Sequence, residues 1–179
     1  IILAHLTYLE SGAQCIITSS YQATLPGFMA IGYDKASASG LILKSVQLAE
    51  EARSRFLALN PQASKPLIAA SIGPYGAYLA DGSEYRGDYV ISDQELTDFH
   101  EPRINLLDNS TADILACETI PGFQEAEVLS EILENAKKPA WISFSCKDGK
   151  HISDGTPIEQ CAAYFAHHPT VFAIGVNCT

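Results

Sequence analysis

Residues 112–136 read ADILACETIPGFQEAEVLSEILENA, and this stretch decides the class of fold. Its first part, 112–119, is a short apolar run that ends on the carboxylate of Glu118, as expected for a buried strand. Pro121 and Gly122 begin a turn, and residues 124–136 have the apolar spacing of a helix. The stretch predicts a strand followed by a helix, which is the repeating unit of a parallel sheet.

The same alternation extends in both directions along the chain. Ser92 and Glu95 match a capping box at the start of a helix, and Thr156 with Pro157 is predicted to cap the last helix. Two segments are expected to be loops, 19–28 and 75–91, and the second is long enough to be functional or lid-like. Helices are expected at 2–10, 35–59, 93–108, 124–136 and 156–167, and strands at 13–18, 65–72, 112–119, 140–145 and 171–178.

Apolar strands separated by amphipathic helices predict a parallel sheet covered by helices. Two architectures remain: a doubly wound open sheet, and a (β/α)8 TIM barrel of which this chain holds about five β/α units. Two observations favour the barrel. Polar, Gly and Pro residues gather at the carboxyl ends of the expected strands, where a barrel has its mouth. In addition, no strand is followed by the Gly-rich phosphate loop of a nucleotide-binding open sheet.

The composition excludes several classes of partner. The chain has 179 residues, with 11 Lys and Arg against 21 Asp and Glu, so its formal net charge is −10 and a nucleic-acid partner is not expected. Hydrophobic residues make up 47%, as in globular proteins, and no apolar run approaches the roughly 20 residues of a membrane span. The first residues do not resemble a signal peptide. We expect a soluble protein without a membrane partner.

The five cysteines form no CxxC pair and lie in apolar surroundings, as thiols in reducing compartments do. A disulfide framework is not expected, and the predicted localisation is cytoplasmic. The five histidines fall on helices or loops and predict no metal site.

Four motifs lie at the ends of expected strands, and a fifth lies in the long loop after the second strand. The four are residues 18–23 (TSSYQA), 71–77 (SIGPYGA), 118–121 (ETIP) and 175–178 (GVNC), and the fifth is 81–89 (DGSEYRGDY). Together they resemble the homocysteine S-methyltransferase family, and the resemblance covers essentially the whole chain. It implies a (β/α)8 catalytic barrel that uses zinc to activate the thiol of homocysteine and gives methionine. The tyrosine-rich run is similar to that of members whose methyl donor is S-methylmethionine or S-adenosylmethionine, rather than betaine.

The chain also departs from the family pattern. Members begin with an Asp-Gly-Gly or Asp-Gly-Ala segment on the first strand and end with a Gly-Gly-Cys-Cys segment that carries two zinc ligands, and neither is present. Residues 1–179 are therefore expected to be the central part of a single homocysteine-binding barrel domain. They would run from its first helix to the end of its sixth strand, with the first strand and the C-terminal units absent.

Cys178 is the candidate metal ligand. An isolated Cys at a strand end is usually core filler, but the resemblance implies that Cys178 is one of three thiolates that bind zinc, with the other two outside this chain. Soft thiolates suit zinc, and three of them leave a fourth position for the substrate sulfur.

Glu118 is the candidate for substrate binding. A carboxylate at the end of an apolar strand must be paired or solvated, so a structural ion pair is one interpretation. The resemblance implies the other, because the matching Glu of the family holds the amino group of homocysteine. Its neighbour Cys117 must point to the opposite face of the strand and is expected to pack in the core.

Three more residues at strand ends, Tyr21, Ser71 and Asn177, could hydrogen-bond the substrate, shape its pocket or serve only the structure. Asn177 could orient the strand end that carries Cys178. In the 75–89 run, the rings of Tyr78, Tyr85 and Tyr89 either face the donor sulfonium or pack the loop against the adjacent helix. Their positions in the fold separate these interpretations.

The expected activity is transfer of a methyl group from a sulfonium donor to the zinc-activated thiol of homocysteine, with the isolated 179-residue chain inactive. Two alternatives stay open. The chain could be a truncated, non-catalytic barrel segment held by a partner copy, since five strands cannot close a barrel and would leave both sheet edges unpaired. It could also be another (β/α) enzyme that takes an anionic substrate without a metal.

Overall fold

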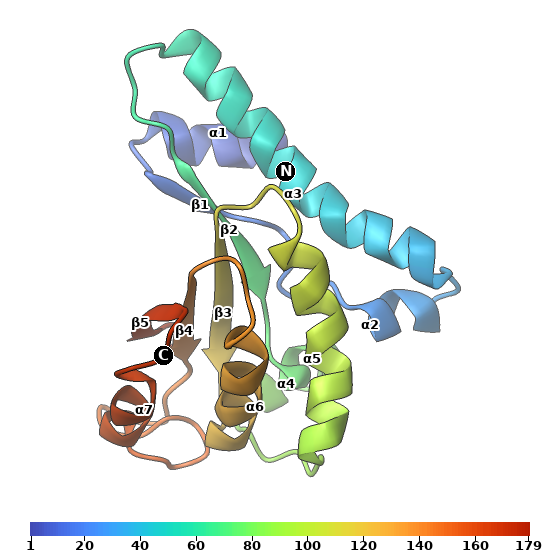
Figure 1. Ribbon diagram of the computed structural model, residues 1–179, viewed down its shortest axis with the longest axis vertical. Coiled ribbons are helices and arrows are strands. Elements are labelled where there is room, and N and C mark those ends of the chain that lie inside the picture. Colours follow the sequence, from blue (N-terminus) through green and yellow to red (C-terminus); the bar gives the residue numbers. More distant parts are fainter.

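The computed structural model describes residues 1–179 and contains one sheet of five parallel strands (Figure 1). Each strand pairs with the next one in the sequence, so the order is β1-β2-β3-β4-β5. A doubly wound sheet reverses its strand order at a switch point, whereas a (β/α) barrel adds strands in sequence. The structure therefore confirms the barrel arrangement. The strands are β1 (Cys15–Ile17), β2 (Leu67–Ile72), β3 (Ile114–Ile120), β4 (Ala140–Phe144) and β5 (Val171–Val176).

The helices follow the predicted alternation. The long α3 begins after Asp34, whose side chain accepts a hydrogen bond from the Ser37 N–H, and α5 begins with the predicted capping box of Ser92 and Glu95. None of the helices is both long and apolar enough to span a membrane. They are α1 (Ile2–Glu10), α2 (Leu25–Ala30), α3 (Lys35–Leu59), α4 (Tyr75–Leu79), the 3-10 turn η1 (Ser83–Tyr85), α5 (Asp93–Asp108), α6 (Phe123–Leu133) and α7 (Ile158–Phe165).

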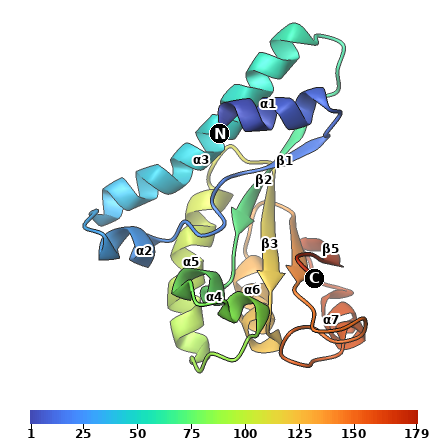
Figure 2. The ribbon, with the colours of Figure 1, turned by 180° about the vertical axis from the view of Figure 1, so that it is seen from behind.

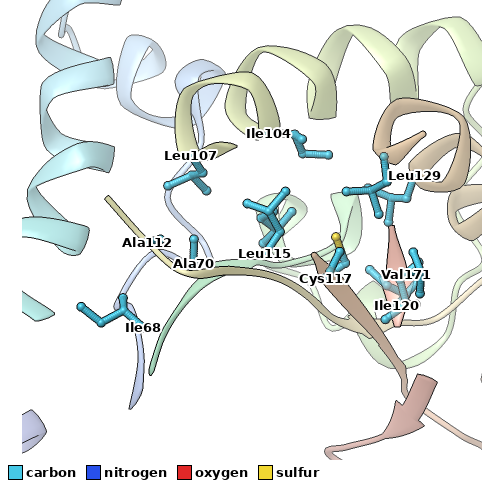
Figure 3. Close-up of a cluster of buried hydrophobic side chains, with 14 of the residues drawn as sticks. Ile68, Ala70, Ile104, Leu107, Ala112, Leu115, Cys117, Ile120, Leu129 and Val171 are labelled. Carbon is cyan, nitrogen blue, oxygen red and sulfur yellow. The ribbon is translucent and has the colours of Figure 1, made fainter. Parts of the chain in front are cut away.

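One face of the sheet forms the main core against the helices. Leu115 and Cys117 of β3 point toward Ile104 of α5 and Leu129 of α6, and all four are buried (Figure 3). The opposite face has a smaller cluster of Ala69, Ile114 and Ala116, with no helix over β3 on that side (Figure 2). Because side chains alternate along a strand, residues next to Cys117 belong to the uncovered face.

The two predicted loops contain short helices. In residues 19–28, the Thr24 hydroxyl accepts a hydrogen bond from the Gly27 N–H and caps α2, which has Pro26 in its first turn. In residues 75–91, α4 and η1 occupy part of the segment. Both predictions were wrong on this point, because a helix of one or two turns carries almost no periodic signal in the sequence.

The start of the last helix also differs from its prediction. Pro157 has an extended ψ of 132° and is the N-cap residue itself, so α7 begins at Ile158 rather than with Pro157 in its first turn. His151 and Pro157 form an isolated β-bridge, which holds this part of the chain extended until the helix starts. The predicted cap at Thr156 was therefore one residue early.

Candidate active site at the carboxyl edge of the sheet

Glu118 lies near the carboxyl end of β3 and faces away from the helix-covered core. The hydroxyl of Ser71, on the neighbouring strand β2, donates a hydrogen bond to Glu118 Oε1. Burial raises the pKa of Glu118, and the bond from Ser71 offsets only part of the rise. The carboxylate takes part in none of the ion pairs of the chain with Lys, Arg or His, so the structural ion-pair interpretation has no support.

Ser71 is itself held by the loop that follows β1. Its N–H donates to Thr18 Oγ1 at 2.9 Å, and its carbonyl accepts a bond from Ser20 Oγ at 2.8 Å. The two hydroxyls of Thr18 and Ser20 lie 2.7 Å apart, and both side chains are buried. Sequence reasoning gave these two residues no role, although they lie in the first quoted motif. Together they fix the strand end from which Ser71 reaches Glu118.

A second cluster joins the ends of β3 and β5, which are separated in the sheet by β4. Asn177 Oδ1 accepts a bond from the Thr119 N–H at 3.0 Å, and Asn177 Nδ2 donates to Thr119 Oγ1 at 2.8 Å. The same amide nitrogen lies 3.5 Å from the sulfur of Cys178, and Thr119 Oγ1 lies 4.0 Å from it. Asn177 thus connects two strand ends and points a polar donor at the thiol.

Backbone geometry marks the same place. Thr119 has a φ of 63° and Cys178 a φ of 53°, both in the left-handed region that β-branched and other non-glycine residues rarely adopt. Such conformations persist only where surrounding contacts hold them, and they are frequent at functional sites. Nothing in the local sequence indicated Thr119, because its conformation depends on a residue 58 positions away.

Tyr21 lies where the chain leaves β1. Its carbonyl accepts a bond from the Gly73 N–H at 3.1 Å, and its ring packs against Gly73, where an added Cβ would be 2.9 Å from ring carbons. The Tyr21 hydroxyl is buried without a hydrogen-bond partner within the chain. Burial is the main cause that raises the pKa of this phenol; the nearby Thr119 side chain offsets part of the rise, and Glu84 and Cys178 add to it.

A hollow of about 330 Å³ lies on the uncovered face, and it brings some of the predicted residues together. Glu118 and Asn177 both line it, with Ser143 and Trp141 of β4 between them. Ser71, Tyr21 and Cys178 do not line the hollow. Ser71 and Cys178 touch the lining residues through their hydrogen bonds, and Tyr21 lies nearer the segment that follows β2.

The other cysteines behave as expected of packing residues. Cys117 and Cys161 are buried, Cys15 and Cys146 are half-buried, and only Cys178 is exposed. Burial raises the pKa of Cys117 to about 12, so it is a poor nucleophile and a poor metal ligand at neutral pH. The chain has no group of three or more His, Cys, Asp or Glu side chains arranged to hold a metal ion. Its one exposed thiol is Cys178, at the carboxyl edge.

The tyrosine-rich run packs on the neighbouring helices. The ring of Tyr75 lies 5.0 Å from that of Phe99 on α5, and the ring of Tyr78 lies 5.5 Å from the same Phe99. The hydroxyl of Tyr89 bonds to Glu125 of α6. These contacts favour the packing interpretation for Tyr78 and Tyr89, and leave only Tyr85, which is 52% exposed, free to face a ligand.

The chain is part of a (β/α) barrel, with its candidate site at the mouth that such barrels use. Three features define it: parallel strands in sequential order, helices on one face of the sheet, and polar side chains at the carboxyl edge.

The family model for homocysteine S-methyltransferase matches residues 1–179. The chain is 54% identical over 175 residues to the homocysteine S-methyltransferase of Escherichia coli strain K12, which covers 97% of this chain and 56% of that relative. It is 53% identical to the homocysteine S-methyltransferase YbgG of Bacillus subtilis strain 168, over 98% of this chain and 57% of the relative.

Solved structures agree with these similarities. The metallated form of the homocysteine methyltransferase MmuM from Escherichia coli matches with a TM-score of 0.95 at 53% identity, over 99% of this chain and 62% of that chain. The chain therefore belongs to the homocysteine S-methyltransferase family. It spans little more than half the length of the curated relatives that it matches.

Proposed function

We propose that residues 1–179 are the central part of a homocysteine-binding barrel domain that transfers a methyl group from a sulfonium donor to homocysteine. One observation carries the proposal. A carboxylate held by Ser71 and a thiol contacted by Asn177 and Thr119 lie at the same edge of one sheet. The first suits the ammonium group of an amino acid, and the second suits a metal that binds the sulfur of that amino acid.

The surroundings of Cys178 fit one corner of a zinc site, because they place one thiol beside two polar neighbours. The amide of Asn177 and the hydroxyl of Thr119 both approach the sulfur, and outer partners of this kind orient a metal ligand. Cys178 would supply one ligand, with the other two thiolates outside this chain. When bound, zinc would keep the homocysteine sulfur deprotonated at neutral pH, where a free thiol is mostly protonated.

The residues of this chain then have distinct tasks. Glu118 binds the ammonium group of homocysteine, while Ser71, fixed by Thr18 and Ser20, holds the carboxylate in position. Asn177 and Thr119 hold the strand end that carries Cys178.

The reaction needs no general base at the methyl group. The homocysteine sulfur forms a bond to the methyl carbon as the bond from that carbon to the donor sulfur breaks, and the electron pair leaves with the donor. We propose S-methylmethionine or S-adenosylmethionine as donor and methionine as product. Alignment of the three atoms can contribute several kcal/mol to the rate. The free thiols would suit a reducing compartment such as the cytoplasm.

The test replaces Glu118 with Gln in the full-length protein. The substitution keeps the size and the Ser71 contact but removes the charge, so homocysteine binding should weaken by about 1.5 to 3 kcal/mol, the range for a charged hydrogen bond. Steady-state kinetics with S-methylmethionine should show a higher KM for homocysteine. Glu127→Gln, an exposed position on α6, is the matched control. If the KM for homocysteine and kcat/KM were unchanged, Glu118 would have a structural role and would not bind the substrate.

A further inference from the structure

A charged network lies between the sheet and helices α5 and α6, outside the site described above. Its centre is Glu125 of α6, which is only 1% exposed. Its Oε1 accepts bonds from the Tyr75 N–H and from His100 Nε2, each at 2.6 Å, and its Oε2 accepts a bond from the Tyr89 hydroxyl. A buried carboxylate is costly unless its oxygens are satisfied in this way.

The network continues from His100 to Arg103, both on α5 and both fully buried. Arg103 Nη2 lies 3.1 Å from His100 Nδ1 and 2.7 Å from the Gly73 carbonyl. A guanidinium can only donate, so Nδ1 is an acceptor and the proton of a neutral His100 is on Nε2, directed at Glu125. The result is a positive Arg103 and a negative Glu125 joined through a neutral imidazole.

The protonation directions agree with this assignment. Burial lowers the pKa of His100, which keeps the imidazole neutral at pH 7, and lowers the pKa of Arg103 to about 10, which leaves it charged. For Glu125, burial alone would raise the pKa, but the bonds from His100 and Tyr89 hold it below its usual value. The carboxylate is therefore an acceptor for all three of its partners.

The positions of those partners suggest what the network does. Tyr75 and Tyr89 are the two ends of the 75–89 segment, and both bind one carboxylate. The middle of the segment is fixed separately, because Ser145, just after β4, donates to the Glu84 carbonyl at 3.0 Å. At its other end the network holds Gly73, whose N–H binds Tyr21 at the mouth. The segment thus crosses the carboxyl edge of the sheet between fixed points.

We propose that Glu125 is a positioning residue that clamps both ends of the 75–89 segment, and that binding of the methyl donor depends on this clamp. The dependence of donor binding on the clamp rests on the proposed function, whereas the clamp itself does not. A buried charge network contributes little net stability compared with apolar packing of the same volume, so stability alone is a weak reason for its presence. Its geometry instead determines the position of one segment.

The experiment uses the full-length protein with Tyr89→Phe, which removes only the hydroxyl, and Glu125→Gln. Tyr8→Phe on α1, which is 67% exposed, and Glu127→Gln on α6 are the matched controls. Loss of one bond to a charged group should speed hydrogen exchange in residues 75–91 about tenfold, with exchange in α3 unchanged. The KM for S-methylmethionine should rise by a similar factor, while the KM for homocysteine stays within about twofold.

Two results would overturn the proposal. Unchanged exchange in residues 75–91 in both variants would show that Glu125 does not hold the segment. Faster exchange with an unchanged donor KM, or with equal rises in both KM values, would show that the clamp does not act on donor binding. A wild-type protein that transfers no methyl group would instead contradict the proposed function, and the exchange measurement would still decide whether the clamp exists.

Discussion

Glu118 and Cys117 are adjacent in the sequence and have opposite environments. Cys117 packs against the helices, and Glu118 lines the hollow on the other face. This arrangement could be predicted because alternation along a strand is a local property. The same is not true of Thr119 or of the buried Glu125. An acidic residue on a helix is usually exposed, and no neighbour in the sequence indicates that His100, Tyr75 and Tyr89 converge on it.

Glu118→Gln should also change stability with pH. Burial raises the folded-state pKa of Glu118 above the ordinary value of a Glu side chain, and the hydrogen bond from Ser71 offsets only part of the rise. A raised carboxyl pKa favours the folded state at pH values below the unfolded pKa, and this contribution is lost as pH rises through the folded pKa. Gln does not titrate, so the variant does not lose this stability as pH rises. It should be more stable than wild type at pH 7 and equal to it at low pH.

Urea unfolding of the two proteins at several pH values measures this effect. The difference in free energy of unfolding should appear as pH rises above the unfolded-state pKa and should level off above the folded-state pKa. Because the same substitution weakens homocysteine binding under the proposed function, a gain in stability with a loss in binding would identify Glu118 as a residue retained for function. A variant less stable than wild type at pH 7 would contradict this interpretation.

At the scale of elements, length decides what the sequence could predict. The helix α3 and the strands β2 and β3 carry enough residues for their periodicity to be clear, and they were predicted within a residue or two. The helices α2 and α4 are only 6 and 5 residues long, and their Pro, Gly and Tyr residues suggested loops. The short α4 is held by tertiary contacts, since Gly76 packs directly on the backbone of Glu84.

Gly73 joins three elements and gives a prediction at this scale. Its N–H binds the Tyr21 carbonyl, its own carbonyl binds Arg103 of α5, and an added Cβ would lie 2.5 Å from the Tyr21 carbonyl oxygen. A backbone atom cannot move away as a flexible side chain can. Gly73→Ala should therefore destabilise the fold by about 1 to 3 kcal/mol, as overpacking does.

Gly40→Ala is the matched control, because Gly40 lies in α3 with open space around it. Ala favours helix over Gly by roughly 0.5 to 1 kcal/mol, so this variant should be more stable than wild type. Chemical denaturation of both variants gives the two free energies of unfolding directly. Equal effects of the same sign would mean that the contact between Gly73 and Tyr21 does not limit packing at the end of β2.

At the scale of the whole molecule, the sheet is open. The strands β1 and β5 each have one neighbour, and apolar side chains near these edges are exposed, among them Ile17, Phe172 and Val176. Closure of a barrel would cover such edges. The barrel itself could be predicted from the polar residues at the carboxyl ends of the strands, where a barrel has its mouth. The position of the hollow follows from the same order of strands. The ligand set for a metal does not follow from the order of strands, because these residues hold no group of three His, Cys, Asp or Glu side chains that could bind one.

Zinc binding is expected to depend on the whole molecule. A zinc site takes three or four protein ligands, and this chain arranges no group of three His, Cys, Asp or Glu side chains that could hold a metal. One exposed thiol is too little, even with the donors of Asn177 and Thr119 directed at it. We expect one zinc per full-length protein and weak or no binding by residues 1–179 alone.

Metal analysis after dialysis, together with titration against a chelator of known affinity, tests this expectation on both forms. Cys178→Ser in the full-length protein should lose the metal, since loss of one thiolate leaves an incomplete ligand set. Cys15→Ser is the control and should keep the metal, because Cys15 lies at the start of β1, away from the carboxyl edge. Tight, stoichiometric zinc on the 179-residue chain at micromolar concentration would contradict the prediction. It would mean that residues of this chain other than Cys178 complete the site, and the division of ligands between this chain and the rest of the barrel would have to be withdrawn.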